Sequence, residues 1–228
     1  MKLLRIACFV AVSIAFLRNV SGQGFVNLDF EAANLSVYGA GPAAVPATNA
    51  IPGWTAYISG IPQTTISFND VALNDAAISI QGTTGFEPAV AGRYSIFLQA
   101  TYREIVTNTA AIGQTGSIPV GDQSLIFLGN LFLAGSIGNV QVTFNRQDLS
   151  LVAISNALNY TIYGADISPY AGQTGQLLFT ANNNTYAELD NIQFSSLPIP
   201  EPSELALTAI GALFLGFHRW RKKLPNPR

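Results

Sequence analysis

The sequence is poor in the side chains on which most metal and nucleophilic sites depend. Its 228 residues include one cysteine and one histidine, which excludes a Cys/His zinc site and argues against a Cys–His or Ser–His–Asp catalytic group. Charged residues make up 11% of the chain, against about 25% in typical domains. The net charge of −2 argues against a nucleic-acid-binding protein, which needs a basic surface. With 14 Phe and 8 Tyr, the chain is too aromatic for a disordered protein and is expected to fold as one domain with short appendages.

Basic residues are scarce in the middle of the chain and gather at its ends. Residues 23–197 contain eleven acidic residues, three arginines and no lysine, for a net charge of −8. Residues 1–22 and 198–228 each carry a net charge of +3. Basic ends beside apolar runs are topology signals at a membrane. We therefore divide the chain into an N-terminal segment, a body and a C-terminal tail at these boundaries.

The first 22 residues have the pattern of a secretory signal peptide. Lys2 and Arg5 precede a 12-residue apolar run at 6–17, which has the length of a signal h-region and is too short for an ordinary membrane span. Small residues follow, and the expected cleavage lies between Gly22 and Gln23. An amphipathic or buried first helix is the alternative, and it is less favoured because the run is apolar all round. Cleavage would remove the one cysteine, so no disulfide is expected.

The tail combines a proline-rich stretch, a short apolar run and a basic cluster. Pro200, Glu201 and Pro202 lie in an extended segment that cannot continue a strand. The uncharged run at 205–217 would form a helix about 20 Å long, shorter than a hydrocarbon core of about 30 Å. The basic residues after this run are Arg219, Arg221, Lys222 and Lys223. Such a cluster stays cytoplasmic, so the body is expected outside the inner membrane.

This three-part tail resembles the PEP-CTERM sorting signal of Gram-negative bacteria. The resemblance covers about the last 27 residues, from the Pro-Glu-Pro triplet onward. It implies an exported protein with a short C-terminal transmembrane helix, processed near the triplet by an exosortase and associated with exopolysaccharide. The precursor would be anchored in the inner membrane, and the product would lie on the outer cell surface or in the extracellular matrix. A plain tail anchor is the alternative, and the shortness of the apolar run speaks against it.

The body has the pattern of an all-β domain. At 139–145, valine and phenylalanine alternate with polar residues, as in a half-buried strand. Apolar runs at 125–128 and 177–179 predict strands covered on both faces. Turn signals rich in Gly, Pro, Asn and Asp separate these segments, and no helical period lies between them. Further strand candidates lie at 66–68, 78–80, 94–102 and 160–162. We therefore expect a single β-sandwich.

The order of motifs along the body resembles the galactose-binding-like jelly roll of many carbohydrate-binding modules. The sequence Asp-Phe-Glu at 29–31 opens the body, and Leu-Asp-Asn-Ile at 189–192 closes it. The resemblance implies that an N-terminal strand bearing the first motif lies near a late strand bearing the second. A sandwich of another topology is the alternative.

A structural calcium ion is the most defined candidate site. The jelly-roll resemblance implies a calcium between the first and last strands, and the matching positions are Glu31 and Asp190, with Asp29 and Glu188 as possible helpers. Carboxylates are among the hard oxygen ligands that Ca²⁺ prefers. The apolar alternation also shifts within 189–192, which a β-bulge would explain. The alternative is that these acids are solvated strand residues or turn caps.

Carbohydrate binding would use aromatic faces for stacking, and amides and carboxylates for sugar hydroxyls. The available aromatic residues are Tyr38, Trp54, Tyr57, Tyr102, Tyr163, Tyr170 and Tyr186. The alternative for Trp54 is the core, because it follows Pro-Gly at the start of a strand, and strand tyrosines are mostly packing residues. A glycoside hydrolase would need two carboxylates flanking a cleft. Eleven acids allow many pairs, and Glu104 beside Arg103 is interpreted as an exposed strand residue.

We interpret the protein as an exported, non-catalytic module that binds polysaccharide or packs within an exopolysaccharide layer. A purely structural or adhesive surface protein without a sugar site is the alternative, and a glycoside hydrolase is a more distant one. The expected partners are an exosortase, polysaccharide and, before processing, the inner membrane. Structural Ca²⁺ is the expected cofactor. The negative body disfavours anionic polymers as ligands unless calcium bridges them.

Overall fold

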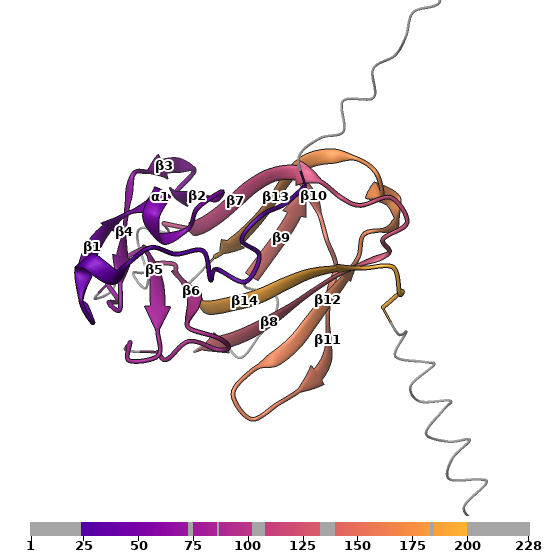
Figure 1. The fold of residues 1–228 in the computed structure, drawn as a ribbon. Helices are drawn as coiled ribbons and strands as arrows, with labels where there is room; N and C mark the ends of the chain where they lie inside the picture. Colours follow the sequence, from indigo (N-terminus) through magenta and orange to yellow (C-terminus); the bar gives the residue numbers. More distant parts are fainter. Residues whose placement is uncertain are drawn as a thin grey trace, which may run out of the picture.

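The computed structural model describes residues 24–72, 75–85, 87–101, 108–132, 140–182 and 185–199. In these ranges the chain is mostly β-structure arranged in two sheets (Figure 1). Its helical segments are single turns: the 3-10 helices η1 (Ser36–Tyr38) and η3 (Ser168–Tyr170) and the α-helix α1 (Ala47–Ala50). The all-β prediction is therefore confirmed. None of the helices in the described ranges has the length and apolar character needed to span a bilayer.

The larger sheet contains eight strands within the described ranges, in the order β1–β4–β5–β6–β14–β8–β12–β11. Their bounds are Ala43–Pro46 (β1), Thr65–Phe68 (β4), Ala77–Gly82 (β5), Tyr94–Gln99 (β6), Ser124–Phe132 (β8), Leu151–Asn156 (β11), Thr161–Asp166 (β12) and Tyr186–Ser195 (β14). Neighbouring strands are antiparallel except β4 and β5, which are parallel. The last strand of the chain, β14, lies in the middle of this sheet between β6 and β8 (Figure 1).

The smaller sheet contains six strands in the described ranges, in the order β10–β9–β13–β7–β2–β3. Their bounds are Thr55–Ile58 (β2), Ile61–Gln63 (β3), Ala110–Ser117 (β7), Val140–Phe144 (β9), Gln147–Asp148 (β10) and Thr174–Ala181 (β13). All of its pairings are antiparallel.

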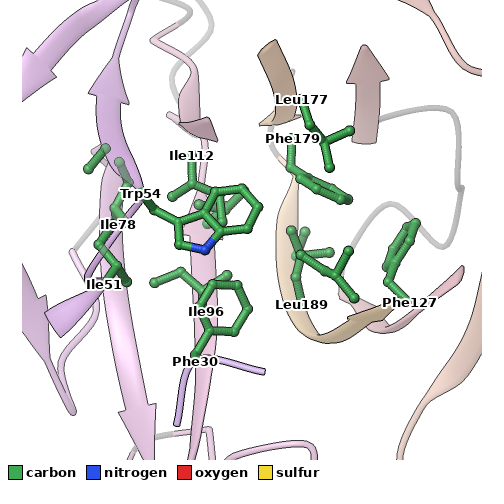
Figure 2. Close-up of a cluster of buried hydrophobic side chains, with 14 of the residues drawn as sticks. Phe30, Ile51, Trp54, Ile78, Ile96, Ile112, Phe127, Leu177, Phe179 and Leu189 are labelled. Atoms are coloured by element: carbon green, nitrogen blue, oxygen red, sulfur yellow. The ribbon is translucent and has the colours of Figure 1, made fainter. Parts of the chain in front are cut away.

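Side chains from both sheets meet in one hydrophobic core (Figure 2). The ring of Phe179 on β13 lies 5.3 Å from that of Phe127 on β8, and 6.2 Å from that of Trp54. Trp54 is 5% exposed, and its Nε1 donates a hydrogen bond of 2.9 Å to the carbonyl of Asn27. The buried indole N–H is thus satisfied, as burial of a polar group requires. The core interpretation of Trp54 is confirmed.

The predicted strands are present, but their burial differs from the prediction in two places. In β9 buried residues alternate with more exposed ones, as expected. The apolar runs of β8 and β13 alternate too, since Ile126, Leu128 and Leu178 are half-buried, so the prediction that these runs are covered on both faces was wrong. Strands with both faces buried include instead β5 and β6. Their polar residues are covered by segments that local sequence patterns did not reveal.

The Asp-Phe-Glu motif lies in turns, so the implied N-terminal strand is wrong. Asn27 and Phe30 have φ of 51° and 57°, in the left-handed region that no strand uses. The Asn27 Oδ1 accepts the N–H of Ala32 at 3.0 Å and holds this turn. The implied neighbourhood is nevertheless confirmed, because the N–H of Ile192 on β14 donates to the carbonyl of Leu28 at 2.9 Å.

The segment that follows β14 stays attached to the larger sheet. Ser124 Oγ donates to the carbonyl of Leu197 at 2.7 Å, and Gln123 donates to the carbonyl of Ser196 at 2.8 Å. Ile199 fills the space over Gly164 that any Cβ would need. Several predicted residues lie outside the described ranges: Gly22, Gln23, Tyr102, Glu104, Pro200, Glu201, Pro202, Arg219, Arg221, Lys222 and Lys223.

Candidate functional site

The face of β5, β6 and β14 that points away from the core is polar and buried. Its polar members are Ser79, Gln81, Ser95, Gln99, Glu188 and Asp190, each at most 2% exposed. The register places them on one face, since Gln81 pairs with Ser95, and Phe97 pairs with both Ser79 and Glu188. We call this surface the outer face.

Backbone carbonyls from the connection between β4 and β5 cover part of the outer face. Gln81 Nε2 donates to the carbonyl of Asp70 at 3.1 Å. Gln99 Nε2 donates to the carbonyls of Ala72 and Asp75 at 2.6 and 2.8 Å. These amides hold loop backbone by hydrogen bonds that an apolar side chain could not make.

A pocket of about 390 Å³ lies on the outer face. Glu188 of β14 and Asn130 of β8 stand opposite each other in the register and both line it. The other lining residues come from two connections, Glu87, Pro88, Ala89 and Val90 between β5 and β6, and Leu158 and Asn159 between β11 and β12. The pocket therefore combines two carboxylates and two amides with apolar side chains. Its volume is within the range of small-molecule sites, near the lower end.

Glu188 is the most perturbed group of this pocket. Ser95 Oγ donates a short hydrogen bond to its Oε1. The pKa of Glu188 is raised to about 8. Burial is the largest cause, the Ser95 hydrogen bond lowers the pKa, and the negative charges of Glu87 and Asp190 raise it. Burial also raises the pKa of Glu87. At neutral pH Glu188 therefore binds a proton that an exposed glutamate would have lost.

None of the described residues that line the pocket is basic. The basic residues within the described ranges are Arg93 and Arg146, and the ion pair found there joins Arg93 to Glu31 at 3.0 Å. The described lining of the pocket thus has acidic character and contributes no counter-ion. Such a site favours neutral or cationic ligands over anionic ones.

The two residues predicted as calcium ligands, Glu31 and Asp190, both bind the end of the β5–β6 connection. Glu31 Oε1 accepts the N–H groups of Arg93 at 2.5 Å and Tyr94 at 3.0 Å, and its Oε2 accepts Arg93 Nε at 3.0 Å. Asp190 Oδ2 accepts the N–H of Ala91 at 2.9 Å. We call this arrangement the carboxylate clamp.

The pKa values within the clamp shift in opposite directions. For Glu31, burial acts to raise the pKa, but the N–H groups of Arg93 and Tyr94 and the charge of Arg93 outweigh it, so the pKa is lowered. The pKa of Asp190 is raised to about 7. Burial is the largest cause, hydrogen bonds from two backbone N–H groups lower the pKa, and the charges of Glu31 and Asp29 raise it. Asp190 therefore feels the charges of Glu31 and Asp29.

The carboxylate oxygens of Glu31 are already occupied by hydrogen bonds, which leaves few lone pairs for a metal ion. Both lone pairs of its Oε1 already accept backbone N–H groups, and its Oε2 accepts a guanidinium N–H. In the part of the chain that the structure describes, no group of three or more Asp, Glu, His or Cys side chains is arranged to hold a metal. The hydrogen bonds account for both carboxylates without an ion, and calcium binding at Glu31 and Asp190 stays a prediction.

The β-bulge predicted near Asp190 is confirmed. The register between β14 and β8 shifts between Asp190 and Gln193, and Asn191 has φ of 48°. The bulge allows Asp190 to face the clamp while Ile192 turns into the core with 2% exposure.

Among the tyrosines considered for sugar stacking, Tyr186 lies beside the pocket. It precedes Glu188 by two residues on β14 and therefore shares its face, and its ring stacks on that of Phe97 at 6.0 Å. Tyr163 is 8% exposed and belongs to the core, and Tyr38 and Tyr170 pack against the core. Tyr57 lies on β2 of the other sheet, where its hydroxyl accepts a 3.4 Å hydrogen bond from Gln176.

Sequence analysis did not identify Glu87, Asn130 and Asn159 as site residues. Loop residues and single amides in strands give no local sign that they will meet. One signal was present: Phe97 lies opposite to Ile96 and Leu98, and a phenylalanine on that face indicates a second covered surface.

Comparison with known proteins adds one weak likeness. No family model matches the chain, and no curated protein matches it. Among solved structures, the chain is similar to the enzymatically active domain of tailspike protein 4 of bacteriophage CBA120, with 12% sequence identity and a TM-score of 0.34. The similarity covers 63% of this chain and 19% of the tailspike chain. At this TM-score no conclusion about fold or function follows.

Proposed function

We propose that this is an exported, non-catalytic protein of the cell surface or extracellular matrix whose outer-face pocket binds polysaccharide. The observation that carries the proposal is a pocket of about 390 Å³ that brings Glu188 and Asn130 of the sheet together with Glu87 and Asn159 of two loops. Carboxylate and amide groups recognise sugar hydroxyls by hydrogen bonds, and the neighbouring apolar side chains suit the C–H faces of a sugar ring.

The finer fold and the cell biology belong to the same proposal. We infer a single β-sandwich of the jelly-roll type for the body, with a signal peptide before it and an exosortase-sorted tail with a short transmembrane helix after it. The sequence resemblance at Pro200, Glu201 and Pro202 supports the sorting step. In this proposal the precursor is held in the inner membrane, and the processed protein joins the extracellular polysaccharide.

Affinity electrophoresis of the full chain through gels that contain different polysaccharides tests binding. We expect selective retardation by at least one glycan, and loss of that retardation in Asn130→Ala. Asn34→Ala is the matched control, because Asn34 is exposed and lies before η1, away from the pocket. Uniform mobility of the wild type across a broad panel, including the polysaccharide of the producing cell, would support the purely structural or adhesive alternative instead.

A glycoside hydrolase is a second candidate, because the pocket holds two carboxylates and the pKa of one is raised. That combination is the acid–base pattern of these enzymes. The small pocket favours binding, since a depolymerase needs room for sugar units on both sides of the scissile bond. Release of reducing ends that is abolished by both Glu87→Gln and Glu188→Gln would establish the hydrolase.

A further inference from the structure

We infer that the outer-face pocket selects a sugar unit that carries a protonated amino group, as in a partly or fully de-acetylated amino-sugar polysaccharide. This inference rests on the proposed function and specifies its ligand. It is carried by two observations: the charge of the pocket and the incomplete hydrogen bonding of Glu188.

The first observation is that Glu87 and Glu188 line one pocket and that no basic residue is among its described lining. Burial of two carboxyl groups in one pocket disfavours their charged forms, and a cation bound between them favours those forms. The described part of the chain contains Arg93 and Arg146, and Arg93 is paired with Glu31. Among the described residues no side chain is left to compensate the two acids, and a cationic ligand would do so.

The second observation is that Glu188 is 2% exposed but only partly hydrogen-bonded. Its Oε1 accepts the Ser95 hydroxyl, while Oε2 has no hydrogen-bond partner among the described residues. Glu188 Oε2 is not among the buried side-chain oxygens that lack a partner, so it can be reached from solvent, and a ligand N–H would complete its hydrogen bonding. An ammonium group has three donors, enough to reach Glu188 Oε2 and Glu87 and to leave one for the Asn130 amide oxygen.

The remaining lining residues indicate a sugar rather than a bare metal ion. A calcium ion needs six to eight oxygen ligands in close contact, whereas half of the lining consists of Pro88, Ala89, Val90 and Leu158. These apolar side chains suit the C–H groups of a pyranose ring. Asn159 adds a further amide for a ring hydroxyl. An acidic sugar would place a further negative charge beside the two carboxyl groups, and the same argument disfavours it.

The test compares three trisaccharides that share one backbone and differ at carbon 2: glucosamine, N-acetylglucosamine and glucose (cellotriose). Calorimetric titration of the full chain is done below the pKa of the sugar amine, in moderate salt. We expect the glucosamine trisaccharide to bind about tenfold or more tightly than the other two, since a desolvated charge-assisted hydrogen bond exceeds a neutral one by at least this factor.

Two pocket variants and one control make the result specific. Glu188→Gln and Glu87→Gln should each abolish most of the preference and keep weak binding of the neutral sugar. Asp122→Asn removes the same charge at the other end of β8 and should keep the preference. Because Glu87 lies in a connection rather than in a strand, its variant tests the inference even where Glu188→Gln is unstable.

Each other outcome overturns the inference and separates it from the proposed function. Equal binding of the three trisaccharides would leave polysaccharide binding standing and remove the amino-sugar preference. A preference that persists in both pocket variants would assign it to the general acidity of the body. Binding of none of the sugars, together with uniform mobility in the glycan gels, would remove both proposals. Displacement of the glucosamine trisaccharide by equimolar Ca²⁺ would mean that the pocket is a metal site.

Discussion

Glu31 and Asp190 hold one short stretch of backbone from two different parts of the chain. Glu31 belongs to the turns that open the body and accepts the N–H groups of Arg93 and Tyr94. Asp190 belongs to the last strand and accepts the N–H of Ala91. The clamp thus ties the start of β6 and the connection before it, which contributes Glu87 to the pocket, to the first turns and to the centre of the larger sheet.

Removal of the clamp should loosen this connection. Glu31→Ala leaves the N–H groups of Arg93 and Tyr94 without their acceptor, and we expect it to lower the free energy of unfolding by about 1–3 kcal/mol. Urea denaturation measures the loss, and hydrogen exchange should be faster at the amides of Arg93 and Tyr94 than in the wild type. Exchange that is unchanged at both amides would contradict the clamp.

The clamp should stabilise the fold with or without calcium. Because the clamp consists of hydrogen bonds, Glu31→Ala should lower the Tm even in EDTA. If calcium also binds at Glu31 and Asp190, added calcium raises the Tm of the wild type by mass action and leaves the Tm of Glu31→Ala and Asp190→Ala unchanged. Scanning calorimetry of the three proteins with calcium or EDTA measures both effects. A calcium-induced rise of equal size in all three proteins would place the ion elsewhere.

Stability should fall as the pH rises from about 5 to about 8. The pKa values of Glu188 and Asp190 are raised in the folded protein, to about 8 and about 7 from 4.5 and 3.8. Between the unfolded-state and folded-state pKa values the folded protein binds more protons than the unfolded chain. The stabilisation is therefore complete below the unfolded-state values of 4.5 and 3.8 and is lost as the pH rises through the folded-state values. We expect the Tm to be at least about 3 °C higher at the acidic end.

Glu188→Gln gives the control for this pH dependence. Glutamine resembles the protonated side chain, so the variant should be less sensitive to pH over the same interval, while Asp122→Asn should behave as the wild type. Thermal unfolding followed by circular dichroism is sufficient. A wild-type Tm that rises steadily toward alkaline pH would show that Glu188 and Asp190 do not titrate in this way.

Deletion of residues 200–228 should release the protein from the cell. The deletion removes the triplet and the basic cluster of the tail, whose sequence predicts membrane retention and sorting. Immunoblots of cell, membrane and medium fractions measure the distribution, and a deletion of 224–228, which keeps the basic cluster, is the control. Equal cell association of the truncated and full chains would remove the sorting proposal and leave the pocket untouched.

The burial of strands with one solvent-exposed face was easier to predict from the sequence than the burial of strands with both faces covered. The alternation in β9 was readable because Gln141 and Thr143 really face outward. In β5 and β6 the serines and glutamines also alternate, and such polar positions are normally solvated. Here the connections before β5 and before β6 cover them, and no local pattern specifies where a loop will fold back.

The candidate site was predictable only where the sequence carried a resemblance. Glu31 and Asp190 were expected to lie close together, and they meet at one stretch of backbone. The predicted strand around Glu31 was wrong, because the backbone at Phe30 is left-handed and forms a turn. The Asp-Phe-Glu motif, which is typical of a strand, gave no sign of this turn. Asn130 and Glu87 are brought to the site by the tertiary structure, and no local sequence pattern indicates that they will meet there.

The position of β14 has a mechanical consequence. Residues 196–199 continue directly from this strand and are fastened beside it by Gln123, Ser124 and Gly164. A tension applied through the C-terminal side of the body therefore reaches a strand that is paired on both sides, with β6 and β8. Its hydrogen bonds lie across the pull and are loaded together in shear, whereas an edge strand pulled from one end would unzip bond by bond. If the domain is held from this side, its fold would resist unfolding by a mechanical force applied there.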